Sequence, residues 1–492
     1  MMKKLLYISL IVITGISFLF QSCEKFLDLE PITSATTGNS YKRAADMEAA
    51  LVSCYNILHE EYFIWDNILL EDVRSDNAYA GPPDDVDIYE YDMLTVSTNN
   101  ARIMWNWGFL YKGIMRCNIV LSKINDVEGL TDTRYKEIKG EARFLRALFY
   151  YNLVHLYGDV PLVETTGTAD PDKIQIPRSP VKDVYDFIVK DLEFAVENLP
   201  DTYSSENNVN KARATKGAAN AMLAKVWAQR PDRDYAKVLS YCDKVINSPA
   251  GYRLLDDYNL LFDGSHYNND ESIFEIQFIG GTPQGNWGPQ LFLPPSLSGD
   301  GWRKYCTPSH NLVDAFNAEN DTIRRDASIM WENVDWVDEY WNADNSVQAV
   351  PFAFKFKHAD GWNSGDQIYL IRLADILLLK AEALANLRQG DLGRSIVNKI
   401  RARVGLAPTT ADDASMPDAI LKERRLELVF EAHRWEDLIR YGKAVNTMLQ
   451  LKELNLITGK YVDYNASENT IILPVPIGEI ERNPKLVQNP GY

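Results

Sequence analysis

The fold class is decided by one stretch, Leu373-Ala374-Asp375-Ile376-Leu377-Leu378-Leu379-Lys380-Ala381-Glu382-Ala383-Leu384. Its apolar and small residues recur at spacings of three and four, which is the pattern of an amphipathic helix. The turn Gln389-Gly390-Asp391 follows, and a second helical pattern returns through residues 392–404. Two such helices joined by a short turn, with alanines on the contact face, predict a helical hairpin of tetratricopeptide type within residues 369–406.

A second hairpin has the same design. Residues 214–229 are rich in alanine, Pro231-Asp232 makes the turn, and residues 234–247 return. Helical periodicity also marks residues 41–58, 101–124, 133–156 and 181–198. The sequence therefore predicts a mainly α fold in which tetratricopeptide-like helix pairs form a scaffold. Because the hairpins are not close copies, unrelated helical hairpins in an α-rich fold are the alternative.

Residues 257–364, between the two hairpins, have a different character. Helical periodicity fades there, and Gly, Pro, Asn, Asp and Ser become frequent. We expect a few short strands, at 272–279 and near 352–357, and a short helix at 309–317. Long irregular segments held by a rigid frame are where binding residues concentrate. We therefore divide one compact unit into a signal peptide (1–22), an N-terminal helical region (23–256), a loop-rich ligand-facing region (257–364) and a C-terminal helical region (365–492).

Tryptophan is concentrated in the loop-rich region. Six of the eleven tryptophans lie there, with polar neighbours: Trp287, Trp302, Trp331, Trp336, Trp341 and Trp362. An indole face suits the C–H face of a pyranose, and nearby carboxylates and amides would bind its hydroxyls. Since aromatic residues more often belong to a core, burial is the alternative. The cluster predicts that at least two of these rings line a ligand site.

A second candidate site is the loop at residues 71–79, which follows a helix. It offers donors and acceptors for a sugar or a peptide through Arg74, Asp76, Asn77 and Tyr79. The acidic loop at residues 82–87 comes next in the chain. A solvated turn or a Ca²⁺-binding surface loop is the alternative, because oxygen ligands suffice for calcium.

The carboxylate-rich stretch at residues 423–440 looks catalytic but is better explained by packing. Glu423, Glu427 and Glu431 recur every four residues and would share one face of a helix. A general acid and base must approach a substrate from opposite sides, which neighbours on one helix cannot do. We expect a partly buried ionic network with Arg424, Arg425 and Arg434. Nucleophile pairs, phosphate loops, dinucleotide fingerprints and zinc-ligand spacings are all missing from the sequence, so we expect neither an enzyme nor a cofactor.

The chain begins with an export signal. Lys3 and Lys4 precede an apolar run over residues 5–20, and Cys23 directly follows the small Ser22. A basic start, a short apolar stretch and a small residue describe a secretory signal. The cysteine resembles a bacterial lipoprotein junction, where its thiol is acylated and becomes the mature N-terminus. An ordinary signal peptide with an incidental cysteine is the alternative.

The charge of the mature chain excludes some partners. The full chain has a formal charge of −18, and loss of the two lysines of residues 1–22 makes it −20. Such a surface repels nucleic acid and anionic lipid headgroups. Four further cysteines, Cys54, Cys117, Cys242 and Cys306, show no close spacing. We expect buried free thiols, with disulfide pairing as the alternative.

Six stretches, in order, resemble the SusD/RagB family of outer-membrane nutrient-binding lipoproteins. They are Cys23-Glu24-Lys25-Phe26-Leu27-Asp28-Leu29-Glu30-Pro31, residues 140–148, Ser272-Ile273-Phe274-Glu275-Ile276-Gln277-Phe278, residues 372–383, residues 423–438, and the C-terminal Asn483-Pro484 with Gln488-Asn489-Pro490-Gly491-Tyr492. The resemblance implies four tetratricopeptide-like helix pairs that support an irregular ligand-binding part. It also implies a lipid-anchored position on the outer membrane, facing the exterior, over a SusC-like TonB-dependent transporter.

The same resemblance implies that an oligosaccharide, or in some members a peptide, is captured and handed on without cleavage. Ligand residues vary within the family and have no fixed motif, so none is carried over by position. A glycoside hydrolase and a helical-repeat adaptor without a small ligand are the hypotheses from other classes. The adaptor hypothesis predicts that all six tryptophans of the loop-rich region are buried.

Overall fold

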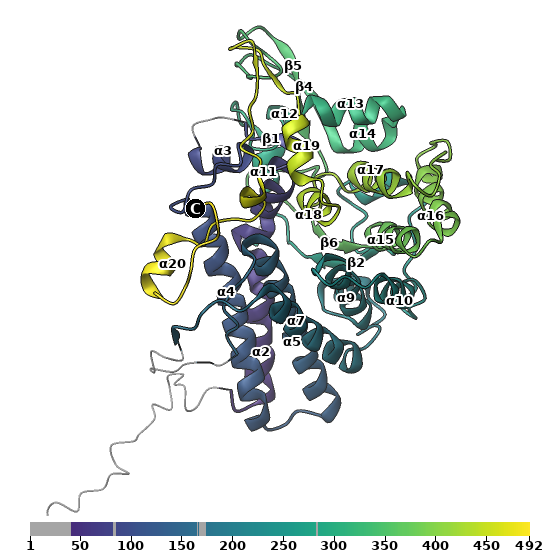
Figure 1. Ribbon diagram of the computed structural model, residues 1–492. Helices are drawn as coiled ribbons and strands as arrows, with labels where there is room; N and C mark the ends of the chain where they lie inside the picture. Colours follow the sequence, from purple (N-terminus) through teal and green to yellow (C-terminus); the bar gives the residue numbers. More distant parts are fainter. Residues whose placement is uncertain (1–40, 82–84, 165, 167–173, 282–283) are drawn as a thin grey trace, which may run out of the picture.

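The computed structural model describes residues 41–81, 85–164, 166, 174–281 and 284–492. Cys23 and the predicted signal peptide lie outside the described residues. Eight helices of the described chain stack in sequence order, each packed on the next: α2 (Ala44–Tyr55), α4 (Ala101–Lys123), α5 (Asp132–Tyr157), α7 (Val181–Asn198), α9 (Lys216–Gln229), α10 (Tyr235–Ile246), α15 (Leu373–Asn386) and α16 (Gly390–Arg403). The first four stand side by side, and the later ones continue the stack (Figure 1). The predicted mainly α scaffold of tetratricopeptide-like pairs is confirmed.

Local sequence explains where the scaffold helices begin and end. The Thr131 side chain accepts a hydrogen bond from the Arg134 N–H at the start of α5, and Gly158 ends that helix with a φ of 72°. An N-cap oxygen satisfies a free backbone donor, and glycine adopts positive φ without steric strain. Thr215 caps α9 in the same way. The alanines of α9 are buried, so its neighbours approach closely.

The segment after α2 is irregular, although the periodicity predicted helix to residue 58. It contains a short 3₁₀ helix, η2 (Asn56–His59), and two short π-helices, η3 (Tyr62–Asp66) and η4 (Leu69–Val73). Nearly every side chain from residue 62 to residue 81 is buried. This segment therefore passes through the interior, where it contacts both the loop-rich region and the C-terminal helices.

Four two-stranded antiparallel sheets brace the loop-rich and C-terminal regions: β1 (Ala78–Tyr79) with β3 (Thr307–Pro308), β2 (Ser272–Ile276) with β6 (Ile368–Arg372), β4 (Ile329–Val334) with β5 (Gln348–Ala353), and β7 (Leu454–Asn455) with β8 (Lys460–Tyr461). The strand predicted at 272–279 is confirmed in its first five residues. The one near 352–357 lies earlier, because β5 ends at Ala353. Residues 369–372 were expected to belong to a helical hairpin and instead lie in β6, which pairs with β2.

Short helices complete the chain: α3 (Val86–Asp92), α8 (Asn207–Ala212), α11 (Pro289–Phe292), α12 (Pro295–Ser298), α13 (His310–Glu319), α14 (Thr322–Ser328), α17 (Met416–Leu428), α18 (Arg434–Arg440), α19 (Ala444–Gln450) and α20 (Ile477–Arg482). The expected single helix at 423–440 is wrong. The chain breaks between α17 and α18, where Phe430 and Ala432 have φ values of 58° and 60°. Such left-handed residues end a helix.

Two further expectations concern the core and the membrane. Cys54, Cys117, Cys242 and Cys306 are buried free thiols, as expected. Within the described residues, every helix is too short or too polar to cross a bilayer.

Candidate functional site

The loop predicted as a ligand site at Arg74, Asp76, Asn77 and Tyr79 is part of the core. All four residues are buried, with an exposed fraction of 4% or less. Asp76 binds the Arg434 guanidinium through both carboxylate oxygens, at 2.7 and 2.8 Å, and Arg425 lies 3.2 Å away. Burial raises the pKa of Asp76, but the two arginines outweigh burial and hold this pKa at about 2. The Asp76 carboxylate is thus a charged partner for the C-terminal helices.

The other three side chains also have internal partners. Asn77 donates to Asp72 at 2.8 Å and accepts from Arg425 at 2.8 Å. Arg74 donates to the carbonyls of residues 470 and 471, and Tyr79 donates to Asp338 at 2.6 Å. The structure therefore contradicts a ligand contact at this loop. In the described residues, no three acidic, histidine or cysteine side chains converge on a possible metal position.

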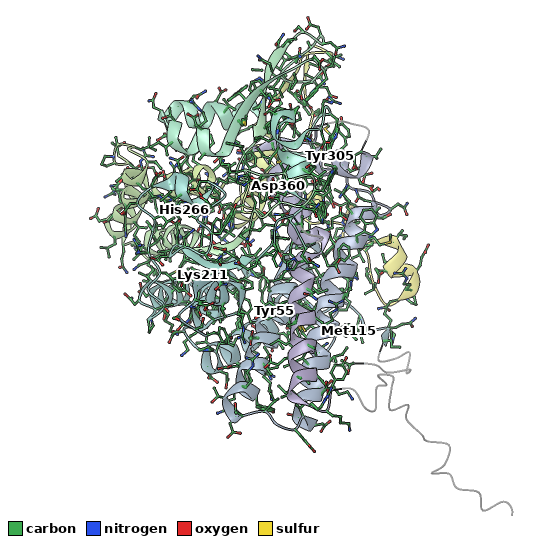
Figure 2. All side chains as sticks on the ribbon, turned by 180° about the vertical axis from the view of Figure 1, so that it is seen from behind. Tyr55, Met115, Lys211, His266, Tyr305 and Asp360 are labelled. Carbon is green, nitrogen blue, oxygen red and sulfur yellow. The ribbon has the colours of Figure 1, made fainter. Side chains whose placement is uncertain are left out.

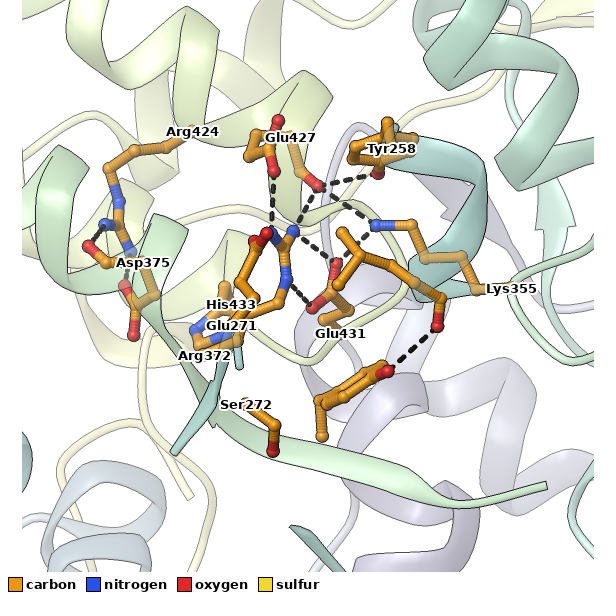
Figure 3. Close-up of polar contacts among 12 residues, drawn as sticks. Tyr258, Glu271, Ser272, Lys355, Arg372, Asp375, Arg424, Glu427, Glu431 and His433 are labelled. Carbon is orange, nitrogen blue, oxygen red and sulfur yellow. Dashed lines mark hydrogen bonds and ion pairs between the residues drawn. The ribbon is translucent and has the colours of Figure 1, made fainter. Parts of the chain in front are cut away.

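The stretch from Glu423 to Arg434 takes part in ionic networks, as predicted, but the partners differ from the expected ones. Its glutamates bind cations from other segments, whereas Arg424, Arg425 and Arg434 bind Asp375 and Asp76. Figure 3 shows Arg372 between Glu427 and Glu431, with its guanidinium 2.6 Å from each carboxylate. Lys355 also pairs with Glu431, and Tyr258 donates to the Glu427 carbonyl. These carboxylates are buried and bound to cations, so none is available as an acid or base for a substrate.

The six predicted tryptophans are all at least partly exposed, and they separate into two groups. Trp287, Trp302 and Trp362 lie around α11, whereas the hairpin of β4 and β5 and its connecting loop carry Trp331, Trp336 and Trp341. Trp362 is 45% exposed and Trp331 is 40% exposed; the other four are half-buried. This exposure disagrees with the adaptor hypothesis. A ligand contact by each ring stays a prediction.

In the hairpin group, two of the three rings have packing roles. The Trp341 indole N–H donates to the Pro308 carbonyl at 3.1 Å, and its ring stacks on His310 at 3.6 Å. Trp336 packs against the small apolar cluster of the hairpin. Trp331 meets Trp341 edge to face and keeps one surface open.

The α11 group is built on one short buried helix. The Gln290 side chain, 2% exposed, accepts from the Trp362 backbone N–H at 3.4 Å and donates to Asp300 at 2.7 Å. The next residue, Leu291, accepts from the Tyr305 N–H at 3.4 Å. Figure 2 shows Tyr305 and Asp360, two residues before Trp362, on the same side of the molecule. Helix α11 therefore fixes the segments that carry Trp302, Tyr305 and Trp362.

A buried lysine, Lys304, packs against one face of the Trp302 ring. The Lys304 ammonium lies 3.7 Å from the centre of the Trp302 ring and donates to the Gln290 carbonyl at 3.0 Å and to Asp300 at 3.3 Å. Burial lowers the pKa of Lys304 to about 8. A cation over an indole face is attracted by the ring quadrupole, so the lysine fixes the ring orientation.

Next to this ring is an open recess with a volume of about 420 Å³, lined by Asp85, Val86, Asp87 and Tyr305. The Tyr305 ring is 5.7 Å from Trp302 and 5.6 Å from the buried Trp65. Asp85 caps α3 and pairs with Arg102 at 3.2 Å. An aromatic ring beside carboxylates, open to solvent, has the composition that binds a sugar: a face for stacking and acceptors for hydroxyls.

Sequence reasoning missed Tyr305, Asp85 and Asp87 as candidate site residues. The acidic loop was visible, and Tyr305 is only three residues from Trp302. However, only the fold shows that α3 faces the Trp302 segment, which is more than 200 residues later in the chain.

Other hollows suit a sugar less well. A central chamber of about 100 Å³ is lined mainly by aromatic and aliphatic side chains, with Lys225, His433 and Glu436 among its charged groups, and contains none of the predicted tryptophans. It is smaller than a cavity that holds benzene, about 150 Å³. A groove of about 810 Å³ beside α9 and α10 has no aromatic side chain in its lining.

Comparison with known proteins identifies the family. Residues 270–492 match the SusD family, and residues 25–227 match the family described as "Starch-binding associating with outer membrane". SusD-like protein P25 of Formosa agariphila is 26% identical over 98% of this chain and 99% of its own length. Starch-binding protein SusD of Bacteroides thetaiotaomicron is 24% identical over 96% of both chains.

Solved structures agree with this result. A laminarin-binding SusD-like protein superposes with a TM-score of 0.76 at 27% identity, over 92% of this chain and 100% of that one. Surface glycan-binding protein A of Bacteroides thetaiotaomicron, in complex with laminarihexaose, has the same fold, with a TM-score of 0.75 at 23% identity over 91% and 100% of the two chains. Sequence and structure together show that this chain belongs to the SusD-like family.

Proposed function

We propose that this protein is a cell-surface lipoprotein that captures an oligosaccharide and delivers it to a SusC-like TonB-dependent transporter. Acylation of Cys23 would hold the body on the outer membrane, facing the exterior. The protein would bind its glycan without cleaving it. The family relationship supports this role, since relatives are named for starch, laminarin and glycan binding.

The observation that carries the proposal is the recess beside Tyr305. It combines an aromatic face, two carboxylates and an open volume of about 420 Å³. The Trp302 ring adjoins that of Tyr305, and the backbone of the exposed Trp362 is bound to Gln290, whose carbonyl also accepts from Lys304. A surface with several rings suits a chain of sugars better than a single one, because each ring can stack one residue of the glycan.

Affinity electrophoresis in gels with and without laminarin, starch and other defined glycans tests this function. We expect one glycan to retard the native protein, and Trp302→Ala and Tyr305→Ala to abolish most of that retardation. Trp227→Ala is the matched control, because Trp227 is also half-buried and also stacks on a lysine, Lys237 at 3.5 Å, but lies on α9. If the native protein and the variants migrate equally with and without every glycan, and the native protein binds peptides, the ligand is a peptide and not a glycan.

A further inference from the structure

We propose that the recess beside Tyr305 selects uncharged glycans and rejects those that carry carboxylate or sulfate groups. This inference rests on the proposed function and names the class of glycan. It comes from the charges around the recess.

The wall of the recess is acidic. Asp85 and Asp87 are two of the four described residues that line it. Asp87 is half-buried, and this partial burial raises the pKa of its carboxyl above the ordinary value. A carboxylate that has lost part of its hydration is a strong acceptor for a sugar hydroxyl, but it repels a second anion with less screening than a fully hydrated one.

The cations beside the recess are already paired. Arg102 binds Asp85 at 3.2 Å, Glu61 at 3.1 Å and Asp66 at 3.5 Å, and it also stacks on Trp65 at 4.6 Å. To contact a ligand anion, Arg102 would have to give up ion pairs and a ring contact that it already makes, so binding the anion would bring no net gain.

The two cations next to Trp302 in the chain, Arg303 and Lys304, also lie beside carboxylates. The Lys304 side chain is 1% exposed and lies between Asp300 and the Trp302 ring. Arg303 is 3.9 Å from Glu339. Among the described residues that line the recess there is no cation. An anionic sugar in the recess would therefore meet Asp87, and Asp85 with a partner, Arg102, that is shared among three carboxylates.

The aromatic part of the site has no such preference. Stacking on Tyr305 and Trp302 depends on the C–H face of the sugar ring, which a neutral glycan and its carboxymethyl derivative share. Discrimination between such a pair must then come from the carboxylates. Because these charges are near the surface, the discrimination should weaken as salt is raised.

The experiment compares each neutral glycan that retards the native protein with its carboxymethylated form, for example laminarin and carboxymethyl laminarin. Affinity is measured by calorimetry at low and high salt. We expect at least about tenfold weaker binding of the carboxymethylated form at low salt and a smaller difference at high salt. Asp87→Asn should narrow the difference. The control Asp391→Asn, on α16, changes the net charge by the same amount as Asp87→Asn, at a side chain that is 92% exposed. It should leave the difference in affinity between the two glycans unchanged.

The outcomes separate the two proposals. Equal or tighter binding of the carboxymethylated glycan, with loss of binding in Trp302→Ala, would overturn the charge selectivity while glycan capture stands. A difference that Asp391→Asn narrows as much as Asp87→Asn would assign the effect to net charge and overturn the role of the recess. Failure of every glycan to bind the native protein would end the proposed function, and the selectivity with it.

Discussion

The Lys304 ammonium lies 3.7 Å from the centre of the Trp302 ring, and its remaining bonds go to Asp300 and the Gln290 carbonyl. The lysine is thus a positioning residue for an indole at the proposed glycan site. Lys304→Met keeps the length of the side chain and removes the charge. We expect about fivefold weaker glycan binding, because a cation–π contact of this kind contributes about 1 kcal/mol. Calorimetry measures the affinity, and an unchanged value would show that the Lys304 contact does not position the Trp302 ring for binding.

The same lysine predicts a pH dependence. Burial lowers the pKa of Lys304 to about 8, whereas an unfolded lysine titrates near 10.4. Glycan affinity should fall as the pH rises through about 8, since the ammonium under Trp302 is lost. Between the folded pKa of about 8 and the unfolded pKa near 10.4, Lys304 is protonated only in the unfolded chain, so its contribution to the free energy of unfolding rises with pH. Lys304→Arg keeps its charge and should remove the drop in affinity. A drop that persists in this variant would assign the titration to another group.

Asp76 should control stability and leave glycan binding unchanged. Its pKa of about 2 lies below the ordinary value of 3.8, so its pairing with Arg425 and Arg434 stabilises the fold fully above about pH 4 and loses this effect as the pH falls toward 2. Asp76→Asn should lower the free energy of unfolding by at least about 2 kcal/mol at pH 7, and by less at pH 3. Urea unfolding measures both. A loss of glycan affinity in the folded variant would restore this loop as a ligand site.

Glu427 is the centre of the buried network, with Arg324, Arg372 and Arg403 all bound to its carboxylate. Glu427→Ala leaves three buried cations without this partner, and we expect a loss of about 3–5 kcal/mol in unfolding free energy. Asp391→Ala removes an exposed partner of Arg394 and should change stability by less than about 0.5 kcal/mol. Similar effects of the two substitutions in urea unfolding would contradict the structural role of the network.

The break between α17 and α18 offers a stabilising substitution. Ala432 has a φ of 60° and is half-buried. Glycine adopts this conformation without the clash that a Cβ brings, so Ala432→Gly should stabilise the protein by up to about 1 kcal/mol. Ala385→Gly, within α15, is the control and should destabilise by about 1 kcal/mol. Thermal unfolding compares the two.

Periodicity was sufficient to predict the scaffold, because each helix pair has its own turn and its own small or apolar contact face. It was not sufficient at Phe430 and Ala432, which carry no glycine or proline to signal a break. The backbone N–H of Phe430 is instead bound by Asp72 at 3.1 Å. Contacts of this range leave no local pattern in a sequence.

The candidate site shows the same limit. The tryptophan cluster led to the region of the proposed recess, but the polar residues around residue 75 were assigned to the surface because their partners are far away in the chain. Asp76 and Arg434 are 358 positions apart. Asp87 and Tyr305 are likewise brought together only by the assembled fold.

The guanidinium of Arg74 reaches the carbonyl of Thr470 across 396 positions of sequence. The interior around Arg74 is therefore completed only when the segment at residues 470–471 is in place. A nascent chain that ends before residue 470 lacks the carbonyls that bind the buried Arg74 guanidinium, so we expect the packing of this core segment to be incomplete until they are present.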